Sequence, residues 1–212
     1  MRRFNASGFL VFSNELNGSI PKELGRLNNL NNLVLANNFL GSSIPDDIFK
    51  CIALQALNLG HNNLNGSVPL SLGSLTNLLS LNLSYNNLTQ GLPVSISKLV
   101  NIRDVNLSHN IFYDLLPTGL ASLCQLRDLD LSHNFFKGKI PISFSPGIVL
   151  DEENCLQGAV KQRMLSSCTT FYAARALTFT GFGTTSPPNP SPPSSSTFDT
   201  SGKKKTHIWE QY

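Results

Sequence analysis

The segment LNLGHNNLNGSVP, residues 57–69, contains the pattern that decides the fold. Leu57 and Leu59 are separated by one residue, which is the period of a short β-strand with one buried face. Asn62 follows where such a strand would turn, and Leu64 and Pro69 follow it at fixed distances. The segment is therefore predicted to be a strand that leads into a turn and then into an arc of chain.

The same pattern recurs along the chain with a constant 24-residue period, which indicates an internal repeat. The asparagine and the proline recur in phase, and the apolar positions around them keep the same period. The repeated asparagines are Asn14, Asn38, Asn62, Asn86, Asn110 and Asn134, and the repeated prolines are Pro21, Pro45, Pro69, Pro93, Pro117 and Pro141.

A repeat of this length cannot bury its own apolar side, so neighbouring repeats are expected to stack as a solenoid with one continuous core. The strands of successive repeats would then form a parallel sheet along one, concave, face. The side-chain amide of the repeated asparagine can both donate and accept hydrogen bonds. It can therefore satisfy backbone groups that a tight buried turn leaves unpaired.

The repeat resembles the plant extracellular type of leucine-rich repeat, Leu-x-x-Leu-x-Leu-x-x-Asn-x-Leu-x-Gly-x-Ile-Pro, over residues 9–145. The resemblance implies an α/β leucine-rich-repeat solenoid, with short parallel strands on the concave face and 3-10 turns and loops on the convex side. We expect residues 1–145 to form six such 24-residue repeats without an N-terminal cap. A cysteine-containing C-terminal cap is expected over residues 146–169, and a Pro/Ser-rich disordered tail over residues 170–212.

A second motif follows the last repeat. Residues 151–155 (DEENC) are followed by Gly158, by the pair at residues 162–163 (QR) and by Cys168. This spacing resembles the C-terminal cap of the leucine-rich-repeat extensin family. Because Met1 lies inside a repeat, we expect the chain to be a truncated member of that family.

The four cysteines can pair in three ways. We expect Cys155 to pair with Cys168, which would close a short loop over the open end of the core and contribute roughly 3 kcal/mol in the loop-entropy model. Cys51 stands at a core leucine position and is expected to be a buried free thiol. Cys124 is expected to lack a partner, because the extensin-like cap usually carries another cysteine where this chain has Ser143.

The composition excludes several classes of protein. Charged residues make up 14% of the chain and the net charge is +3, which is too little for a nucleic-acid-binding surface. No apolar run is long enough to cross a membrane, and only a short apolar run follows the basic start, so no signal peptide is expected. The expected localisation, extracellular in the cell wall or apoplast, therefore follows from the resemblance.

Sequons for N-glycosylation agree with an extracellular protein. Asn82 and Asn106 lie between the two leucines of their strands, where a glycan would obstruct the open face. We therefore expect glycosylation on the turn side of the repeats, at Asn17, Asn65 and Asn87.

The concave face is the expected ligand-binding surface, because the outward side chains of stacked strands form a wide preformed surface. This surface changes from amide-rich to charged towards the C-terminal repeats, which suits a polar or basic ligand. The expected contact residues are Asn58, His61, Asn82, Tyr85, Arg103, Asp104, Asn106, His109, Arg127, Asp128, Asp130 and His133.

No catalytic residue, metal site or cofactor is predicted. Side chains of the concave face point outward in parallel, whereas acid–base or nucleophilic catalysis needs groups that converge. His109 and His133 are expected about 5 Å apart on adjacent strands. At that distance they could share a metal ion or sense pH, but Ser-His-Asn is an ordinary triplet of this repeat.

We therefore expect a non-enzymatic, secreted, cell-wall-associated protein that binds a signalling peptide or another protein on its concave face. The Pro-rich residues 186–193 favour polyproline II geometry and, with the rest of the tail, are expected to contact cell-wall polysaccharide. Two alternatives stay open. One is a truncated ectodomain of a leucine-rich-repeat receptor kinase or receptor-like protein, and the other is an inhibitor of pathogen wall-degrading enzymes of the polygalacturonase-inhibitor type.

Overall fold

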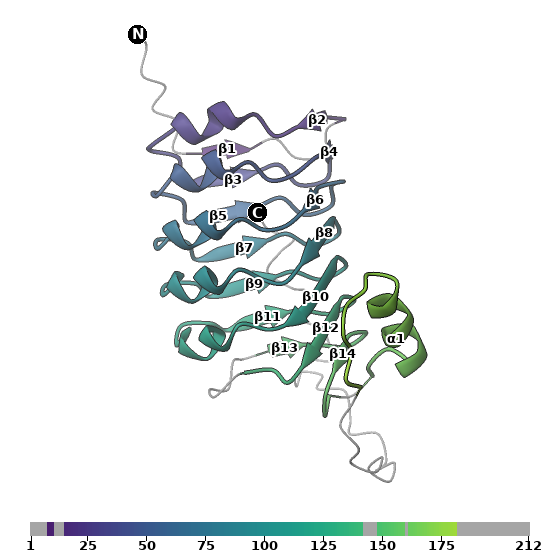
Figure 1. Ribbon diagram of the computed structural model, residues 1–212. Coiled ribbons are helices and arrows are strands. Elements are labelled where there is room, and N and C mark those ends of the chain that lie inside the picture. Colours follow the sequence, from purple (N-terminus) through teal and green to yellow (C-terminus); the bar gives the residue numbers. More distant parts are fainter. Residues whose placement is uncertain (1–7, 11–14, 142–147, 160, 182–212) are drawn as a thin grey trace, which may run out of the picture.

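The computed structural model describes residues 8–10, 15–141, 148–159 and 161–181, which form stacked coils of chain (Figure 1). Each coil repeats the path of the one before it, as the constant period of the sequence predicts. Asn14, Ser143 and the chain from residue 182 to residue 212, including the Pro-rich segment, lie outside the described residues.

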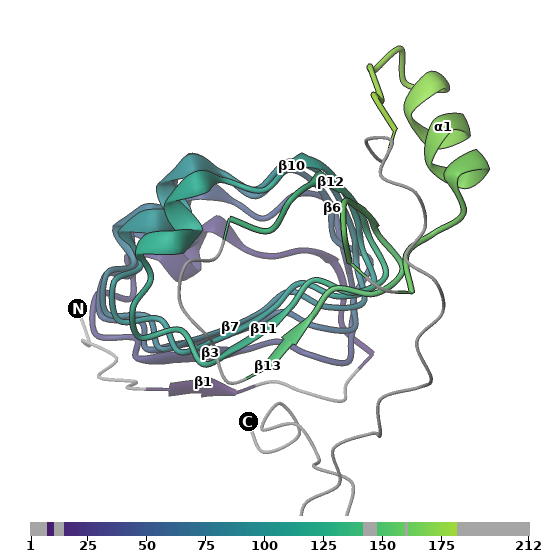
Figure 2. The same cartoon turned by 90° about the horizontal axis from the view of Figure 1, so that it is seen from below.

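One side of every coil is a strand of a seven-stranded parallel sheet (Figure 2). The register advances by one repeat per strand up to β11, so Leu57 lies opposite Leu33 on one side and Leu81 on the other. The strands, in sheet order, are β1 (Gly8–Leu10), β3 (Asn32–Val34), β5 (Ala56–Asn58), β7 (Ser80–Asn82), β9 (Asp104–Asn106), β11 (Asp128–Asp130) and β13 (Ile148–Leu150).

Five 3-10 helices lie on the opposite side of the coils from this sheet, within the chain that the structure describes (Figure 2). Each follows a repeated proline, whose fixed φ ends the preceding extended segment. The prediction of 3-10 turns on the far side is confirmed. The helices are η1 (Lys22–Arg26), η2 (Asp46–Lys50), η3 (Leu70–Ser74), η4 (Val94–Lys98) and η5 (Thr118–Ser122).

A second set of short strands connects the seven-stranded sheet to these helices, where the sequence predicted only turns and loops. It forms because coils of nearly equal length bring neighbouring backbones into register after the asparagine turn. The strands β6 (Asn65–Gly66), β8 (Asn87–Gln90), β10 (Ile111–Leu115), β12 (Phe135–Gly138) and β14 (Cys155–Leu156) make a five-stranded sheet, and β2 (Asn17–Ser19) pairs with β4 (Phe39–Gly41).

The repeated leucines fill the space inside the coils. Those of the strands point inward, and their side chains are at most 1% exposed at Leu33, Leu57, Leu81, Val105 and Leu129. Because each coil covers the apolar end of the next, the core is continuous along the stack.

The repeated asparagines hold adjacent coils together by hydrogen bonds. Asn110 is representative: its Nδ2 donates to the carbonyls of Leu83, Leu107 and Ser108, at 2.9, 3.2 and 3.2 Å. Its Oδ1 accepts from the backbone N–H of Leu88 at 2.9 Å. Since Leu83 and Leu88 belong to the preceding coil, one side chain satisfies backbone groups of two coils.

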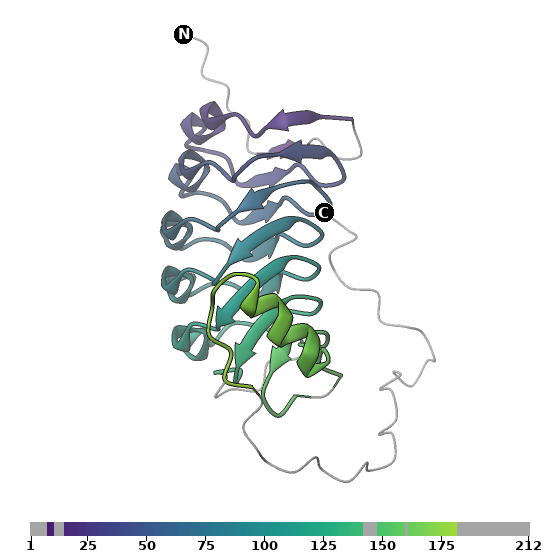
Figure 3. The same ribbon diagram turned by 45° about the vertical axis from the view of Figure 1, so that its right-hand side comes forward.

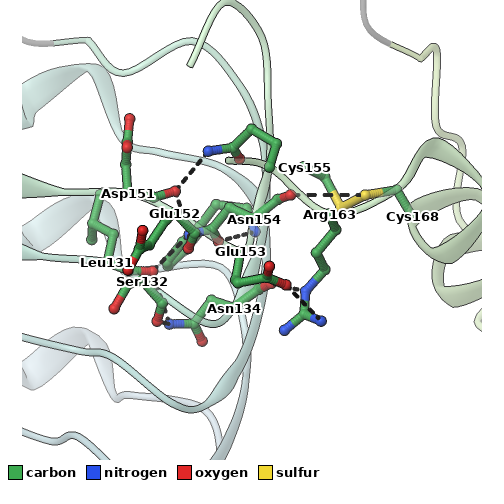
Figure 4. Close-up of polar contacts among 12 residues, drawn as sticks. Leu131, Ser132, Asn134, Asp151, Glu152, Glu153, Asn154, Cys155, Arg163 and Cys168 are labelled. Carbon is green, nitrogen blue, oxygen red and sulfur yellow. Dashed lines mark hydrogen bonds and ion pairs between the residues drawn. A yellow bond between two sulfur atoms is a disulfide. The ribbon is translucent and has the colours of Figure 1, made fainter. Parts of the chain in front are cut away.

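Asn154 supplies the last member of this asparagine ladder, although it follows Asn134 sooner than the repeat period predicts. Its Nδ2 donates to the Leu131 and Asp151 carbonyls at 2.8 and 3.1 Å (Figure 4). Its Oδ1 accepts from the Phe136 N–H at 3.1 Å. The DEENC motif is thus a shortened repeat, which adds β13 and β14 to the two sheets. The segment was predicted to belong to the cap, and its repeat was not predicted.

The cap is fixed by the predicted disulfide between Cys155 and Cys168, whose Cα atoms are 6.0 Å apart. Cys168 lies in helix α1 (Leu165–Ala173), which packs beside β10 and β12 (Figure 3). The hydroxyl of Tyr172 donates to the Phe135 carbonyl at 2.7 Å and accepts from Asp114 N–H at 3.0 Å. Burial raises the pKa of Tyr172 to about 12, so this hydroxyl stays protonated and able to donate.

The folded cap extends past the predicted boundary at residue 169. Helix α1 continues to Ala173, and Phe179 stacks on Tyr172 with ring centroids 5.1 Å apart. The prediction of a disordered tail from residue 170 is therefore wrong for residues 170–181, because their aromatic side chains complete a small second core. Of the other cysteines, Cys51 is a buried free thiol, as predicted, and Cys124 is free and exposed.

Helix α1 has nine residues, and the described part of the chain contains no helix that is both long and apolar enough to span a membrane.

Replacing a ladder asparagine should be far more destabilising than replacing an exposed one. Asn110→Ala removes all four hydrogen bonds and leaves buried backbone groups unpaired, so we expect a loss of about 3 kcal/mol or more in the free energy of unfolding. Asn101→Ala, the control, removes one exposed bond to the Thr76 carbonyl and should cost under about 1 kcal/mol. Urea unfolding monitored by circular dichroism measures both, and equal losses would contradict the role given to the ladder.

Removing the disulfide should destabilise the cap. The double variant Cys155→Ser/Cys168→Ser is expected to lose about 3 kcal/mol, because the open loop gains entropy on unfolding. Cys124→Ser, which removes an exposed free thiol, is the matched control and should leave unfolding unchanged. Thermal unfolding monitored by circular dichroism gives the melting temperatures, and an unchanged melting temperature in the double variant would show that the bond is dispensable.

Candidate ligand-binding surface

A column of four stacked rings runs along one edge of the seven-stranded sheet. His61, Tyr85, His109 and His133 each precede a ladder asparagine, and each has a left-handed φ of 52° to 55°. Because the same backbone turn gives every ring the same orientation, the rings stack with successive centroids 4.2, 4.0 and 4.1 Å apart. We call these residues the ring column; His61 and Tyr85 are exposed, and His109 and His133 are half-buried.

Two histidines of the ring column, His61 and His109, have a lowered pKa. Burial lowers the pKa of His61. Burial is also the main cause that lowers the pKa of His109, followed by the charge of His133, which outweighs the opposite effect of Asp130. The predicted proximity of His109 and His133 is confirmed, but their rings lie face to face, so they present edges to solvent.

Asn58, Asn82 and Asn106, which were predicted to point into solvent, are buried, with 7%, 6% and 8% of their surface exposed. The side chains lie in register on β5, β7 and β9, so neighbouring strands cover their flanks. We call them the amide row. The expectation of open side chains is therefore wrong for these three residues.

The orientation of the amide row is fixed by the residue two positions further along each strand. The Oδ1 of Asn82 accepts from the N–H and Oγ of Ser84, at 3.0 and 2.8 Å. Asn106 is held in the same way by Ser108, at 3.0 and 2.7 Å. The Oδ1 of Asn58 accepts from the N–H of Gly60 at 3.1 Å, so each carbonyl of the row faces the residue two positions later.

The charged residues lie at the C-terminal end of the sheet. Asp104 and Asp128 are register partners on β9 and β11, and Asp130 lies two residues beyond Asp128; all three are half-buried. Burial raises the pKa of Asp104, and the adjacent carboxyl of Asp128 raises it further, against weaker opposing effects of Arg127 and Arg103. Both arginines are exposed, as predicted.

The asparagines of the glycosylation sequons differ in how far they are buried. Asn17, Asn65 and Asn87 are exposed, and Asn65 and Asn87 lie opposite each other on β6 and β8. Asn82 and Asn106 are buried, so a glycan on either would disrupt the sheet face as well as cover it. The exposure of Asn17, Asn65 and Asn87 is consistent with glycosylation there, which stays a prediction.

Within the described residues, no three His, Cys, Asp or Glu side chains gather so that they could hold a metal ion. Two groups that shape the surface were not predicted from the sequence. Glu153 has a φ of 54° and takes the position of a ring residue in the shortened repeat, where Arg163 pairs with it at 3.7 Å. The serines that orient Asn82 and Asn106 were also not predicted, although a Ser at the second position after Asn recurs in the sequence.

These features define a leucine-rich-repeat fold. Family models described as leucine-rich repeat match residues 28–88 and residues 125–146. No curated protein is significantly similar to the chain.

Solved structures of plant proteins share the fold. A TDR receptor is 34% identical, with a TM-score of 0.69 over 76% of this chain and 28% of that one. The Arabidopsis receptor kinase HAESA, in complex with the peptide hormone IDA and the co-receptor SERK1, is 28% identical, with a TM-score of 0.65 over 72% of this chain and 26% of that one. A plant ice-binding protein is 26% identical, with a TM-score of 0.64 over 71% of this chain and 50% of that one. The chain thus spans half or less of the length of these relatives.

Removing the charge of Asp104 should stabilise the fold at neutral pH. Because its pKa is raised in the folded state, wild-type stability falls as pH increases from the unfolded value, about 3.9, through the folded value. Asp104→Asn is therefore expected to melt at a higher temperature than wild type at pH 7, with the difference lost at pH 3. Glu23→Gln removes an exposed carboxylate on η1 and is the control, which should leave the melting temperature unchanged at both pH values. A lower melting temperature for Asp104→Asn than for wild type at pH 7 would contradict the raised pKa of Asp104.

Proposed function

We propose that this chain is a non-enzymatic binding module that recognises a peptide or protein ligand through the seven-stranded sheet. The observation that carries the proposal is the fixed array on that face: a ring column and an amide row that recur from one strand to the next, and charged residues on β9 and β11. Such an array is organised before any ligand arrives, so binding would not have to order it.

The spacing of the strands favours a long, narrow ligand. Equivalent side chains recur at the strand spacing, about 4.8 Å, so a chain laid across the strands meets the same kind of group at each one. An extended peptide makes many such contacts, whereas a compact small molecule would touch few of them.

The relatives support this class of ligand. The structure of HAESA contains a peptide hormone and a co-receptor, and this chain matches part of that ectodomain. We infer a similar ligand class here, and the same relatives favour the alternative that this chain is part of a receptor ectodomain.

We further propose an extracellular location, in the cell wall or apoplast. The resemblance of residues 151–168 to the extensin-like cap, the disulfide and the exposed sequons support it. A contact between the tail and cell-wall polysaccharide, and inhibition of wall-degrading enzymes, stay hypotheses without support from the described residues.

The test is selection of ligands followed by mutation of the ring column. Peptides selected from a random dodecapeptide library on the wild-type chain should bind Tyr85→Ala/His109→Ala at least tenfold more weakly, a change of about 1.4 kcal/mol. The control is Phe39→Ala, which removes an exposed aromatic side chain from β4, off the sheet face. Isothermal calorimetry gives the dissociation constants; failure to select any binder, or loss of affinity only in Phe39→Ala, would refute the proposal.

A further inference from the structure

The C-terminal half of the ring column contains two imidazoles in direct contact. His109 and His133 are both half-buried and lie face to face, with ring centroids 4.1 Å apart. Their nitrogens form no hydrogen bond or ion pair with another described residue. The edges of the two rings therefore offer a pair of adjacent donors to whatever lies on the sheet face.

The carboxylates of the sheet face are engaged with other groups. The side chains of Asp104 and Asp128 hydrogen-bond to each other. The Oδ1 of Asp130 accepts from the N–H and the Oγ of Ser132, at 3.0 and 2.7 Å. Burial lowers the pKa of His109, the next ring of the column lowers it further, and Asp130 opposes both without reversing the shift.

The charges of the cap, which lie beyond the last ring, are also paired. Glu153 takes the ring position of the shortened repeat and pairs with Arg163 at 3.7 Å. Glu152, whose carbonyl accepts from the N–H of His133, pairs with Lys161 at 3.3 Å. No carboxylate that the structure describes is therefore left as a counter-ion for the two rings.

The other end of the column differs from this pair. Tyr85 lies between His61 and His109, with ring centroids 4.2 and 4.0 Å from theirs. His109 and His133 are thus the two histidines that touch each other within the described chain, so a charge on one acts directly on the other.

We propose that His109 and His133 together bind a carboxylate of the ligand and take up a proton with it. The carboxylate is either the C-terminus of a peptide or the side chain of an aspartate or glutamate, because all three present the same two acceptor oxygens. This inference rests on the proposed function and specifies its ligand as a peptide with an acidic group.

The contact between the rings links binding to protonation. A proton on one imidazole disfavours a proton on its neighbour 4.1 Å away, so the free column resists full protonation. A carboxylate at the ring edges offsets this repulsion and forms charge-assisted hydrogen bonds with the protonated rings. Binding should therefore take up protons and should strengthen as pH falls through the range in which histidines titrate.

A metal ion fits the ring pair less well than a carboxylate. Zinc binds in the plane of an imidazole at about 2.0–2.1 Å from the nitrogen. Two ring planes stacked 4.1 Å apart and inclined by only 16° do not converge on one ion at that distance. Hydrogen bonds are longer, and each ring can donate to its own oxygen of a carboxylate.

The first test compares two synthetic libraries on the full wild-type chain at pH 5.5: random dodecapeptides with free C-termini, and C-amidated dodecapeptides without aspartate or glutamate. We expect binders from the first library only, with dissociation constants at least tenfold higher at pH 7.5. Calorimetry at pH 6.5, in buffers of different ionisation enthalpy, should show that the protein takes up protons as a selected peptide binds. Amidating that peptide, or changing its acidic residues to asparagine or glutamine, shows which carboxylate is bound.

The second test removes the titrating rings but keeps polar side chains. His109→Gln/His133→Gln should bind the selected peptide at pH 5.5 no better than wild type does at pH 7.5, and without taking up protons. The matched control, His207→Gln, changes the remaining histidine outside the ring column, which lies beyond the described residues, and should bind within twofold of wild type. Proton uptake that persists in the double variant but disappears in Asp104→Asn would assign it to Asp104 and refute the ring site.

The outcomes separate the two proposals. If peptides without a carboxylate bind as well at pH 5.5, or if acidic peptides bind without proton uptake, the carboxylate site is refuted and the binding function stands. These two results need only the wild-type chain, so they decide the question even if the double variant does not fold. If neither library yields a binder at either pH, both proposals are refuted.

Discussion

The hydrogen bonds of the asparagine ladder are the interaction on which the rest of the structure depends. A coil that turns sharply inside a protein leaves backbone N–H and C=O groups facing an apolar core, where no water can reach them. One asparagine per coil supplies two donors and an acceptor, and it shares them between its own coil and the preceding one. The ladder therefore sets both the shape of each coil and its position on the next.

The candidate ligand-binding surface is a consequence of that constraint. Because every coil leaves the sheet through the same left-handed turn, the residue before each ladder asparagine takes the same orientation, and four rings become a column. The serines beyond the strands likewise orient Asn82 and Asn106. Function can then vary by changing single outward residues, as the step from Ser80 to Asp104 and Asp128 illustrates, without altering the path of the backbone.

The solenoid and its sheet could be predicted from the sequence, because the constant repeat period and the alternating leucines directly reflect stacking and burial. The burial of Asn58, Asn82 and Asn106 could not be predicted from the sequence. The alternation of apolar and polar residues along a strand tells which face a side chain takes, but not how closely neighbouring side chains cover it. The role of Asn154 in the ladder was not predicted for a different reason. The last repeat is shorter than the others and breaks the period, so only the hydrogen bonds of Asn154 identify it as a ladder asparagine. Residues 170–181 are not part of any repeat, so only their packing in the structure shows that they belong to the folded cap.

The most direct test is hydrogen exchange of the backbone amides that donate to the ladder asparagines. The N–H groups of Leu64, Leu88, Phe112 and Phe136 each donate to the Oδ1 of an asparagine in the following coil. We expect all four to exchange slowly and at similar rates, including Phe136, whose partner is Asn154. Exchange of these amides as fast as that of exposed loop amides would contradict the claim that the asparagines hold the coils together.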